Sequence, residues 1–281
     1  MSLVNDAVVL EGKDLTKVYE SKRRRPPVTA AKDVSFTLRA GESLGVVGES
    51  GSGKSTVANM VLGLIRPTRG TIAISGKERQ GKPKGSRERL ARAKEVQMVF
   101  QDPYGSLDRR LSVGRALDDT LRRHQPRMDK DNRSARIQEL LGHVRLNPEL
   151  GASYPHQLSG GQRQRVAIAK ALAVEPAILV LDEAVSALDV SVQAQILELL
   201  NDIRATTGVS LIFVSHDLAV VSEVTDYVLV MYRGEAVESG VTNEVLLNPQ
   251  HPYTEMLLSS APGPGWRPER VAELRAQFAA S

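Results

Sequence analysis

The chain has 281 residues, of which 41% are hydrophobic, 25% are charged and none is cysteine. These ordinary fractions exclude a disordered, collagenous or fibrous chain. The lack of cysteine excludes disulfides, thiolate zinc sites, cysteine-ligated iron–sulfur clusters and a cysteine nucleophile. The net charge is +4, but residues 22–25 and 77–94 hold twelve basic and two acidic residues, so the remainder carries −6.

The two basic segments are interpreted as solvated loops and helix faces, with contacts to phosphate, lipid headgroups or a partner as the alternative. No aromatic residue interrupts either segment, and the whole chain has only 11 aromatic residues, so binding to nucleic acid is not expected. Residues 1–6 lack the basic and apolar regions of a secretory signal. No apolar run approaches the roughly 18 residues of a spanning helix. We therefore expect a cytoplasmic chain that reaches a membrane only through another protein.

Buried strands alternate with helices along most of the chain. Short strands are predicted at residues 7–10 and 34–38. Continuous apolar runs, typical of buried parallel strands, occur at residues 43–48, 177–181 and 209–214. Each of these three runs leads into helical spacing, and the first helix is expected to extend through Ile65 until Pro67 closes it. The alternation predicts a parallel sheet with helices on both faces.

The middle and the end of the chain have different patterns. Residues 101–157 show two amphipathic helical stretches, near 113–124 and 134–144, and no convincing strand, which indicates a helical insertion. After Asp226 come two short predicted strands, residues 227–231 and 236–238, and helical pieces near 244–247 and 254–258. A linker at 262–265 and a polar terminal helix at 268–279 are predicted to follow.

A glycine-rich phosphate loop follows the first buried strand. It has the spacing of glycine, four residues, glycine, lysine and then serine or threonine, and it precedes a helix. Glycines let successive N–H groups point inward, and the helix start adds further N–H groups and its positive dipole end. Lys54 is predicted to contact the β- and γ-phosphates, Ser55 to ligate Mg²⁺ and Thr56 to reach the α-phosphate. The candidate nucleotide-binding residues in this loop are Gly48, Glu49, Ser50, Gly51, Ser52, Gly53, Lys54, Ser55 and Thr56.

Two carboxylates end the second buried strand, in the sequence Ile-Leu-Val-Leu-Asp-Glu at residues 178–183. Asp182 is placed to hold Mg²⁺ through water, and Glu183 is placed to orient and polarise the attacking water. The alternative is a solvent-facing acidic turn at a strand end. Upstream, a serine followed by two glycines at a predicted helix start indicates a second anion site. Its residues are Leu158, Ser159, Gly160, Gly161 and Gln162.

With this pentapeptide the sequence resembles the ATP-binding cassette (ABC) family, whose signature it matches. Further landmarks of the family occur in order: Gln101, the aspartate loop and His216. Tyr19 matches the aromatic residue that stacks on adenine. The aspartate loop consists of Ser186, Ala187, Leu188 and Asp189. Taken singly, Gln101 is also interpretable as a loop amide, His216 as a helix cap and Tyr19 as a packed strand residue.

The resemblance implies an α/β fold. Its core is a P-loop NTPase (RecA-like) parallel sheet, with an antiparallel β subdomain and an inserted α-helical subdomain. The expected segments are 1–100 (first part of the core), 101–157 (helical subdomain, continuing to about 173), 174–245 (second part of the core) and 246–281 (C-terminal extension). Two such domains are expected to face each other head to tail, so that Ser159, Gly160 and Gly161 act in trans. His216 would contact the γ-phosphate, and Gln101 would sense Mg²⁺ and the attacking water.

Within the family, the chain most resembles the ATPase subunits of bacterial oligopeptide and dipeptide importers, a group that includes nickel importers. The residues that carry this resemblance are 154–157, 186–193 and, most specifically, 248–254. Ala184 departs from the proline that relatives often have there. The resemblance implies ATP and Mg²⁺ as cofactors, a homodimer or a heterodimer with a paralogue, integral permease subunits and, indirectly, an extracytoplasmic binding protein. It also implies a peripheral position on the cytoplasmic face of the membrane.

Two other functions remain open from the sequence. One is a soluble ABC ATPase in DNA repair or translation, which would use the basic charge directly. The gap between Ser55 and Leu158 holds no heptads and no cysteine, and so lacks the coiled-coil or zinc insertions of the repair members. The other is an ATPase attached to an enzyme complex, such as the carbon–phosphorus lyase accessory proteins, which resemble this branch.

Overall fold

A computed structural model describes residues 7–20, 26–79, 83–101, 105 and 107–260. The basic residues 22–25, the linker at 262–265 and the predicted terminal helix at 268–279 lie outside the described residues. The chain divides into two compact units, residues 1–81 with 212–281 and residues 82–211. Among the described residues, no helix has the length and apolar character needed to cross a membrane.

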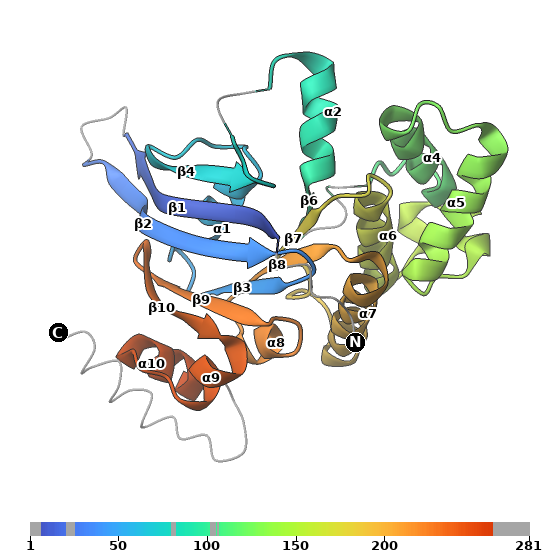
Figure 1. The fold of residues 1–281 in the computed structure, drawn as a ribbon. Coiled ribbons are helices and arrows are strands. Elements are labelled where there is room, and N and C mark those ends of the chain that lie inside the picture. Colours follow the sequence, from blue (N-terminus) through green and yellow to red (C-terminus); the bar gives the residue numbers. More distant parts are fainter. Residues whose placement is uncertain (1–6, 21–25, 80–82, 102–104, 106, 261–281) are drawn as a thin grey trace. The chain divides into compact units, whose positions relative to one another are not determined.

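The first unit contains an antiparallel sheet with the strand order β2-β1-β4-β5 (Figure 1). Its strands are β1 (Val8–Tyr19), β2 (Val28–Arg39), β4 (Arg69–Ile74) and β5 (Lys77–Glu78). The predicted runs at 7–10 and 34–38 lie in β1 and β2, but both strands are 12 residues long. Their register shifts several times, and Asp14 and Asp33 have positive φ angles. Such irregularities interrupt the two-residue hydrophobic period, so the sequence pattern revealed only part of each strand.

The buried strands of the first unit form the second layer. β3 (Ser43–Val47) pairs in parallel with β9 (Tyr227–Tyr232), which pairs antiparallel with β10 (Glu235–Val241). On its other side β3 neighbours β8 (Ser210–Ser215). Every residue of β3 and β8 is buried, which explains their continuous apolar sequences. The Asp226 carboxylate accepts hydrogen bonds from the backbone N–H and the hydroxyl of Ser43 and so joins the starts of β3 and β9.

Four helices complete the described part of the first unit: α1 (Lys54–Val61), α8 (Leu218–Ser222), α9 (Thr242–Leu247) and α10 (Pro252–Ser260). The helix after the phosphate loop is shorter than predicted. It ends at Val61 rather than near Ile65, because Gly63 adopts a left-handed conformation with φ of 71° and turns the chain before Pro67 is reached.

The second unit pairs β6 (Val96–Val99) in parallel with β7 (Ile178–Asp182). Parallel pairing is therefore confirmed in both units. The helices are α2 (Gly85–Glu95), α4 (Val113–His124), α5 (Lys130–His143), α6 (Gly160–Leu172) and α7 (Val190–Thr207), with short 3₁₀ turns at Pro148–Ala152 and Pro155–Gln157. No strand occurs among the described residues of 101–157, as predicted. Helix α2 was not predicted as a separate element, since none of its residues is buried and it has no apolar face. Its exposed residues agree with the interpretation of the basic segment 77–94 as solvated loops and helix faces.

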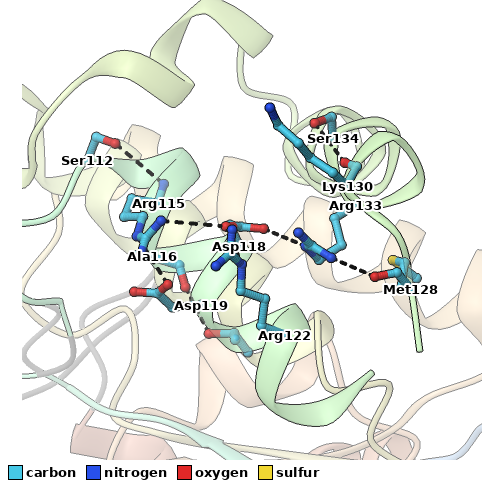
Figure 2. A network of polar contacts seen from close by, with 11 residues as sticks. Ser112, Arg115, Ala116, Asp118, Asp119, Arg122, Met128, Lys130, Arg133 and Ser134 are labelled. Carbon is cyan, nitrogen blue, oxygen red and sulfur yellow. Dashed lines mark hydrogen bonds and ion pairs between the residues drawn. The ribbon is translucent and has the colours of Figure 1, made fainter. Parts of the chain in front are cut away.

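Asp118 lies at the centre of an ionic network that ties α4 to α5 (Figure 2). Its carboxylate accepts a hydrogen bond from Arg133 Nε at 2.7 Å and lies 2.9 Å from Arg122 Nε and 3.9 Å from Arg115. Burial disfavours the charged form, but the Arg133 hydrogen bond and the charges of Arg122, Arg133 and Arg115 outweigh it, so the pKa of Asp118 lies below its usual value. The network therefore stabilises the fold when Asp118 is ionised.

We expect Asp118→Asn to destabilise the chain by about 1–3 kcal/mol at pH 7, because a largely buried charge-assisted hydrogen bond is lost. Because the pKa of Asp118 is lower in the folded chain than in the unfolded chain, where it is about 3.9, the ionised carboxylate stabilises the fold above this pH. This stabilisation disappears as the pH falls through the pKa of Asp118 in the folded chain. The difference between variant and wild type should therefore shrink below about pH 4. Thermal unfolding of both proteins between about pH 3 and pH 7 measures this difference in stability. Asp119→Asn, which removes an exposed pair with Arg115, is the matched control, and equal losses in the two variants would contradict the prediction.

Candidate functional site

The phosphate loop connects β3 to α1 and passes close to two other strands of the first unit. Gly48 has a φ of 149°, and a Cβ atom there would lie 2.2 Å from the backbone oxygen of Met231. Gly53 has a φ of 105°, and its Cβ would lie 2.3 Å from the backbone oxygen of Ala30. Both positions therefore require glycine for conformation and for space. The phosphate loop predicted from the sequence has the backbone path that such a loop needs.

Lys54 is buried within this loop, with only 5% of its surface exposed. Its ammonium group donates hydrogen bonds to the backbone oxygens of Gly48, at 2.7 Å, and Glu49, at 2.8 Å. The buried hydroxyl of Ser52 has no hydrogen-bond partner among the described residues. Ser55 is exposed at the first turn of α1. A buried cation, an unpaired hydroxyl and the N–H groups of a helix start together fit a phosphate group.

Tyr19 and His216 lie at strand ends of the first unit. The Tyr19 ring ends β1, is 43% exposed and has the Lys17 ammonium 5.2 Å from its centroid. It is therefore not the packed strand residue of the alternative interpretation, and stacking on adenine stays a prediction. His216 follows β8 and is exposed. The cap of α8 is Asp217, whose carboxylate accepts from the N–H groups of Ala219 and Val220, so His216 is not the helix cap.

The two predicted carboxylates follow one another at the end of β7 in the second unit. Asp182 is the last residue of the strand, and Glu183 has a φ of 47° in the left-handed region. This costly conformation for a non-glycine residue turns the chain sharply after the strand. The carbonyl of Glu183 accepts hydrogen bonds from the backbone N–H of Ser186, at 3.2 Å, and from its hydroxyl, at 2.9 Å.

The side chain of Gln101 joins the same cluster. Its amide Nε2 donates to the Ser186 hydroxyl at 3.2 Å. The structure thus brings together one residue from each of three predicted motifs: Gln101 after β6, Glu183 after β7 and Ser186 in the aspartate loop. The motif residues were predicted from the sequence, but no sequence signal indicates that the Ser186 hydroxyl links the Gln101 side chain to the backbone of Glu183.

The signature pentapeptide forms the start of α6. Ser159 caps the helix: its hydroxyl accepts from the N–H of Gln162 at 3.2 Å, and the Gln162 side chain accepts from the N–H of Ser159 at 2.9 Å. This capping box confirms the predicted serine cap. Gly161 approaches α7 so closely that a Cβ would lie 2.5 Å from Val192 Cγ1. Leu158 is buried, and Ser159 is exposed beside a helix start.

In the aspartate loop, Ser186, Ala187 and Asp189 are exposed and Leu188 is half-buried, and Asp189 directly precedes α7. No group of three or more histidine, aspartate or glutamate side chains that could hold a metal occurs among the described residues. The assignment of Ser55, Gln101 and Asp182 to Mg²⁺ stays a prediction: Ser55 lies in the first unit, and Gln101 and Asp182 lie in the second.

The second unit also has a hollow of about 440 Å³ beside β6. Its lining includes the buried apolar residues Val99 and Ala171 and also Phe100, which directly precedes Gln101 and is 48% exposed. Charged side chains that line the hollow include Asp119, Arg123 and Lys170. A hollow lined by both apolar and charged side chains is suited to binding a partner segment.

A glycine-rich loop that opens a helix after a buried parallel strand, in a chain with a strand-end carboxylate pair, defines the class of P-loop nucleoside triphosphatases. The family model described as ABC transporter matches residues 31–186, and that described as oligopeptide/dipeptide transporter, C-terminal region, matches residues 237–279. The chain belongs to the ABC transporter family and carries the C-terminal region of its oligopeptide/dipeptide branch.

Individual relatives agree with this membership. The oligopeptide transport ATP-binding protein OppF of Escherichia coli is 46% identical over 92% of this chain and 78% of its own length. The di/tripeptide transport ATP-binding protein DppF of Pseudomonas aeruginosa is 45% identical over 90% of this chain and 79% of its own length. Among solved structures, the dimeric post-hydrolysis state of the ATP-binding cassette MJ0796 with ADP and Pi has a TM-score of 0.73 at 29% identity, over 83% of this chain and 98% of that chain. The chain cbiO1 of Clostridium perfringens, part of the transporter complex cbiONQ, has a TM-score of 0.76 at 25% identity, over 96% of this chain and 99% of that chain.

Proposed function

We propose that the chain binds and hydrolyses ATP as the ATP-binding subunit of a bacterial peptide importer, a translocating ATPase. The observation that carries the proposal is the combination of two matches in one chain, since the ABC transporter match includes the phosphate loop and the second match is to the oligopeptide/dipeptide C-terminal region. Relatives named for oligopeptide and di/tripeptide transport support peptides as the cargo class.

In this proposal the phosphate loop holds the triphosphate, as the buried Lys54 ammonium and the N–H groups at the start of α1 neutralise its charge. Tyr19 stacks on the adenine, and His216 contacts the γ-phosphate. Ser55, Asp182 and Gln101 are the residues that would hold Mg²⁺, which when bound offsets the negative charge of the phosphates. Glu183 orients the attacking water and accepts its proton, while the Ser186 hydroxyl restrains the Glu183 backbone.

The proposed working unit contains two ATPase chains, either two copies of this one or this one with a paralogue. The exposed Ser159 and the N–H groups at the start of α6 would cover the γ-phosphate bound to the partner chain. The exposed aspartate loop, residues 186–189, would lie along the contact between the two chains. The structure of MJ0796 with ADP and Pi is dimeric, which supports a paired state for this family.

We further propose that integral permease subunits hold the dimer on the cytoplasmic face of the membrane and that a segment of the permease occupies the hollow beside β6. Phe100 lies at this hollow and is followed by Gln101, whose side chain bonds to Ser186. Movement of a bound segment would thus shift Phe100 and Gln101, and through Gln101 the Ser186 side chain of the catalytic cluster in the second unit. An extracytoplasmic binding protein would deliver the cargo to the permease. The named relatives are transport proteins and do not favour the alternatives of a lyase-associated or nucleic-acid-associated ATPase.

The test is reconstitution with the permease and binding-protein genes that neighbour this chain in its genome. We expect the complex in proteoliposomes to hydrolyse ATP faster when the binding protein and a peptide mixture are added, and to accumulate peptide. A complex containing Glu183→Gln is the control: if hydrolysis drives uptake, this complex should not accumulate peptide. Copurification of the native chain with a lyase or a nucleic acid, in place of a permease, would contradict the proposal.

A further inference from the structure

The C-terminal segment at residues 248–254 is held against β10 of the first unit by hydrogen bonds. The carboxylate of Glu238 in β10 accepts hydrogen bonds from the backbone N–H groups of Gln250, at 2.8 Å, and His251, at 3.1 Å. The imidazole Nδ1 of His251 then accepts from the backbone N–H of Tyr253 at 3.2 Å. These bonds set the start of α10 and the position of the Tyr253 side chain. Residues 250 and 251 are therefore held to β10 through Glu238, in addition to the backbone contacts within the segment.

Tyr253 extends from this anchored segment to the phosphate loop. Its side chain is fully buried, and its ring packs against Tyr232 with 4.4 Å between the centroids. Its hydroxyl oxygen accepts a hydrogen bond from the backbone N–H of Glu49 at 2.9 Å. Burial raises the pKa of the phenol to about 12, so the hydroxyl stays protonated at physiological pH.

The N–H of Glu49 and the C=O of Gly48 belong to one peptide unit. Tyr253 binds the N–H of this unit, and the Lys54 ammonium binds its C=O at 2.7 Å. Because a peptide unit is planar, holding its N–H fixes the direction of its C=O. Gly48, with its φ of 149°, lacks the side chain that would otherwise restrict this unit. The tyrosine and the lysine therefore act on two ends of the same rigid group.

We propose that Tyr253 is a positioning residue for the phosphate loop, which orients the Gly48–Glu49 peptide and through it the Lys54 ammonium that receives the nucleotide phosphates. The C-terminal segment thereby takes part in ATP binding, in addition to any role it has in recognising a transport partner. This inference rests on the proposed function, because it assumes that Lys54 binds ATP. Glu238, His251 and Tyr253 form the connection from β10 to the loop.

The test compares Tyr253→Phe with wild type in the full chain. We expect the variant to keep its thermal midpoint within a few degrees, to bind ATP about fivefold more weakly and to keep kcat within about twofold at saturating ATP, as expected for loss of one hydrogen bond. The amide hydrogen of Glu49 should exchange about tenfold faster in the absence of nucleotide. Tyr227→Phe is the matched control, since no hydrogen bond of its hydroxyl to another described residue is found, and it should change none of these values.

A double-mutant cycle distinguishes positioning of Lys54 from general support of the fold. In a Lys54→Ala background, Tyr253→Phe should no longer weaken ATP binding, because the side chain that it positions has been removed. An undiminished fivefold effect in that background would overturn the inference. So would wild-type affinity in Tyr253→Phe alone, and in that case the proposed function would stand. If the wild-type chain itself failed to bind ATP, the proposed function and this inference would both fall.

Discussion

Replacing Glu183 with glutamine is expected to slow ATP hydrolysis by about 100-fold or more while ATP binding persists. The amide keeps the length and shape of the side chain but cannot accept the proton of the attacking water. The backbone should be unaffected, since the left-handed turn at Glu183 is held by hydrogen bonds from Ser186 to its carbonyl, which the substitution leaves in place. Phosphate release measures the first effect, and nucleotide titration the second. With ATP bound and unhydrolysed, the variant is also expected to accumulate as a closed dimer in size-exclusion chromatography.

Glu175→Gln provides a matched control for this experiment. Glu175 also has a positive φ angle, of 57°, lies in the same unit and is exposed near Arg136. The same chemical change there should leave turnover unaltered. If Glu183→Gln retained turnover within about threefold of wild type, the barrier would have risen by less than about 1 kcal/mol, and the assignment of Glu183 as the general base would be wrong.

The strands that were predicted well are those buried on both faces. Residues 43–48 and 209–214 are continuous apolar runs, and the structure has β3 and β8 there with every residue buried. In β1 and β2, exposed polar residues alternate with buried ones and the register shifts, so only fragments of these strands were visible in the sequence. Helix α2 was missed for a related reason, since it buries no residue and its sequence carries no apolar period.

The candidate site was predictable as a set of residues, but its internal contacts were not. The spacing of glycines, lysine and hydroxyl residues marks a phosphate loop because each residue type has a distinct task in a short segment. Long-range hydrogen bonds leave no such local pattern. Tyr253 bonds to Glu49 across 204 positions of sequence, and Gln101 bonds to Ser186 across 85. These pairings depend on how the strands are arranged, which hydrophobic periodicity does not specify. The basic residues 22–25 lie outside the described residues, so lipid contact there stays a hypothesis.

Lys54→Ala is expected to weaken ATP binding itself, in contrast to Glu183→Gln. The Lys54 ammonium is buried and held by two carbonyl oxygens of the loop, so its charge is fixed where phosphates would bind. Loss of a charge-assisted hydrogen bond of this kind costs about 1.5–3 kcal/mol, which corresponds to roughly 10- to 150-fold in affinity. Equilibrium titration with ATP measures the change.

Two further variants separate charge from packing in this measurement. Lys54→Gln can still donate to a loop carbonyl but has no charge, so it should lose nearly as much affinity as Lys54→Ala while unfolding closer to the wild-type temperature. Lys32→Ala removes an exposed lysine that pairs with Glu235 at 2.6 Å, and it should bind ATP like wild type. Wild-type affinity in Lys54→Gln would mean that the loop binds phosphate through its backbone N–H groups without needing the lysine charge, and the assignment of Lys54 as the phosphate-binding cation would then be wrong.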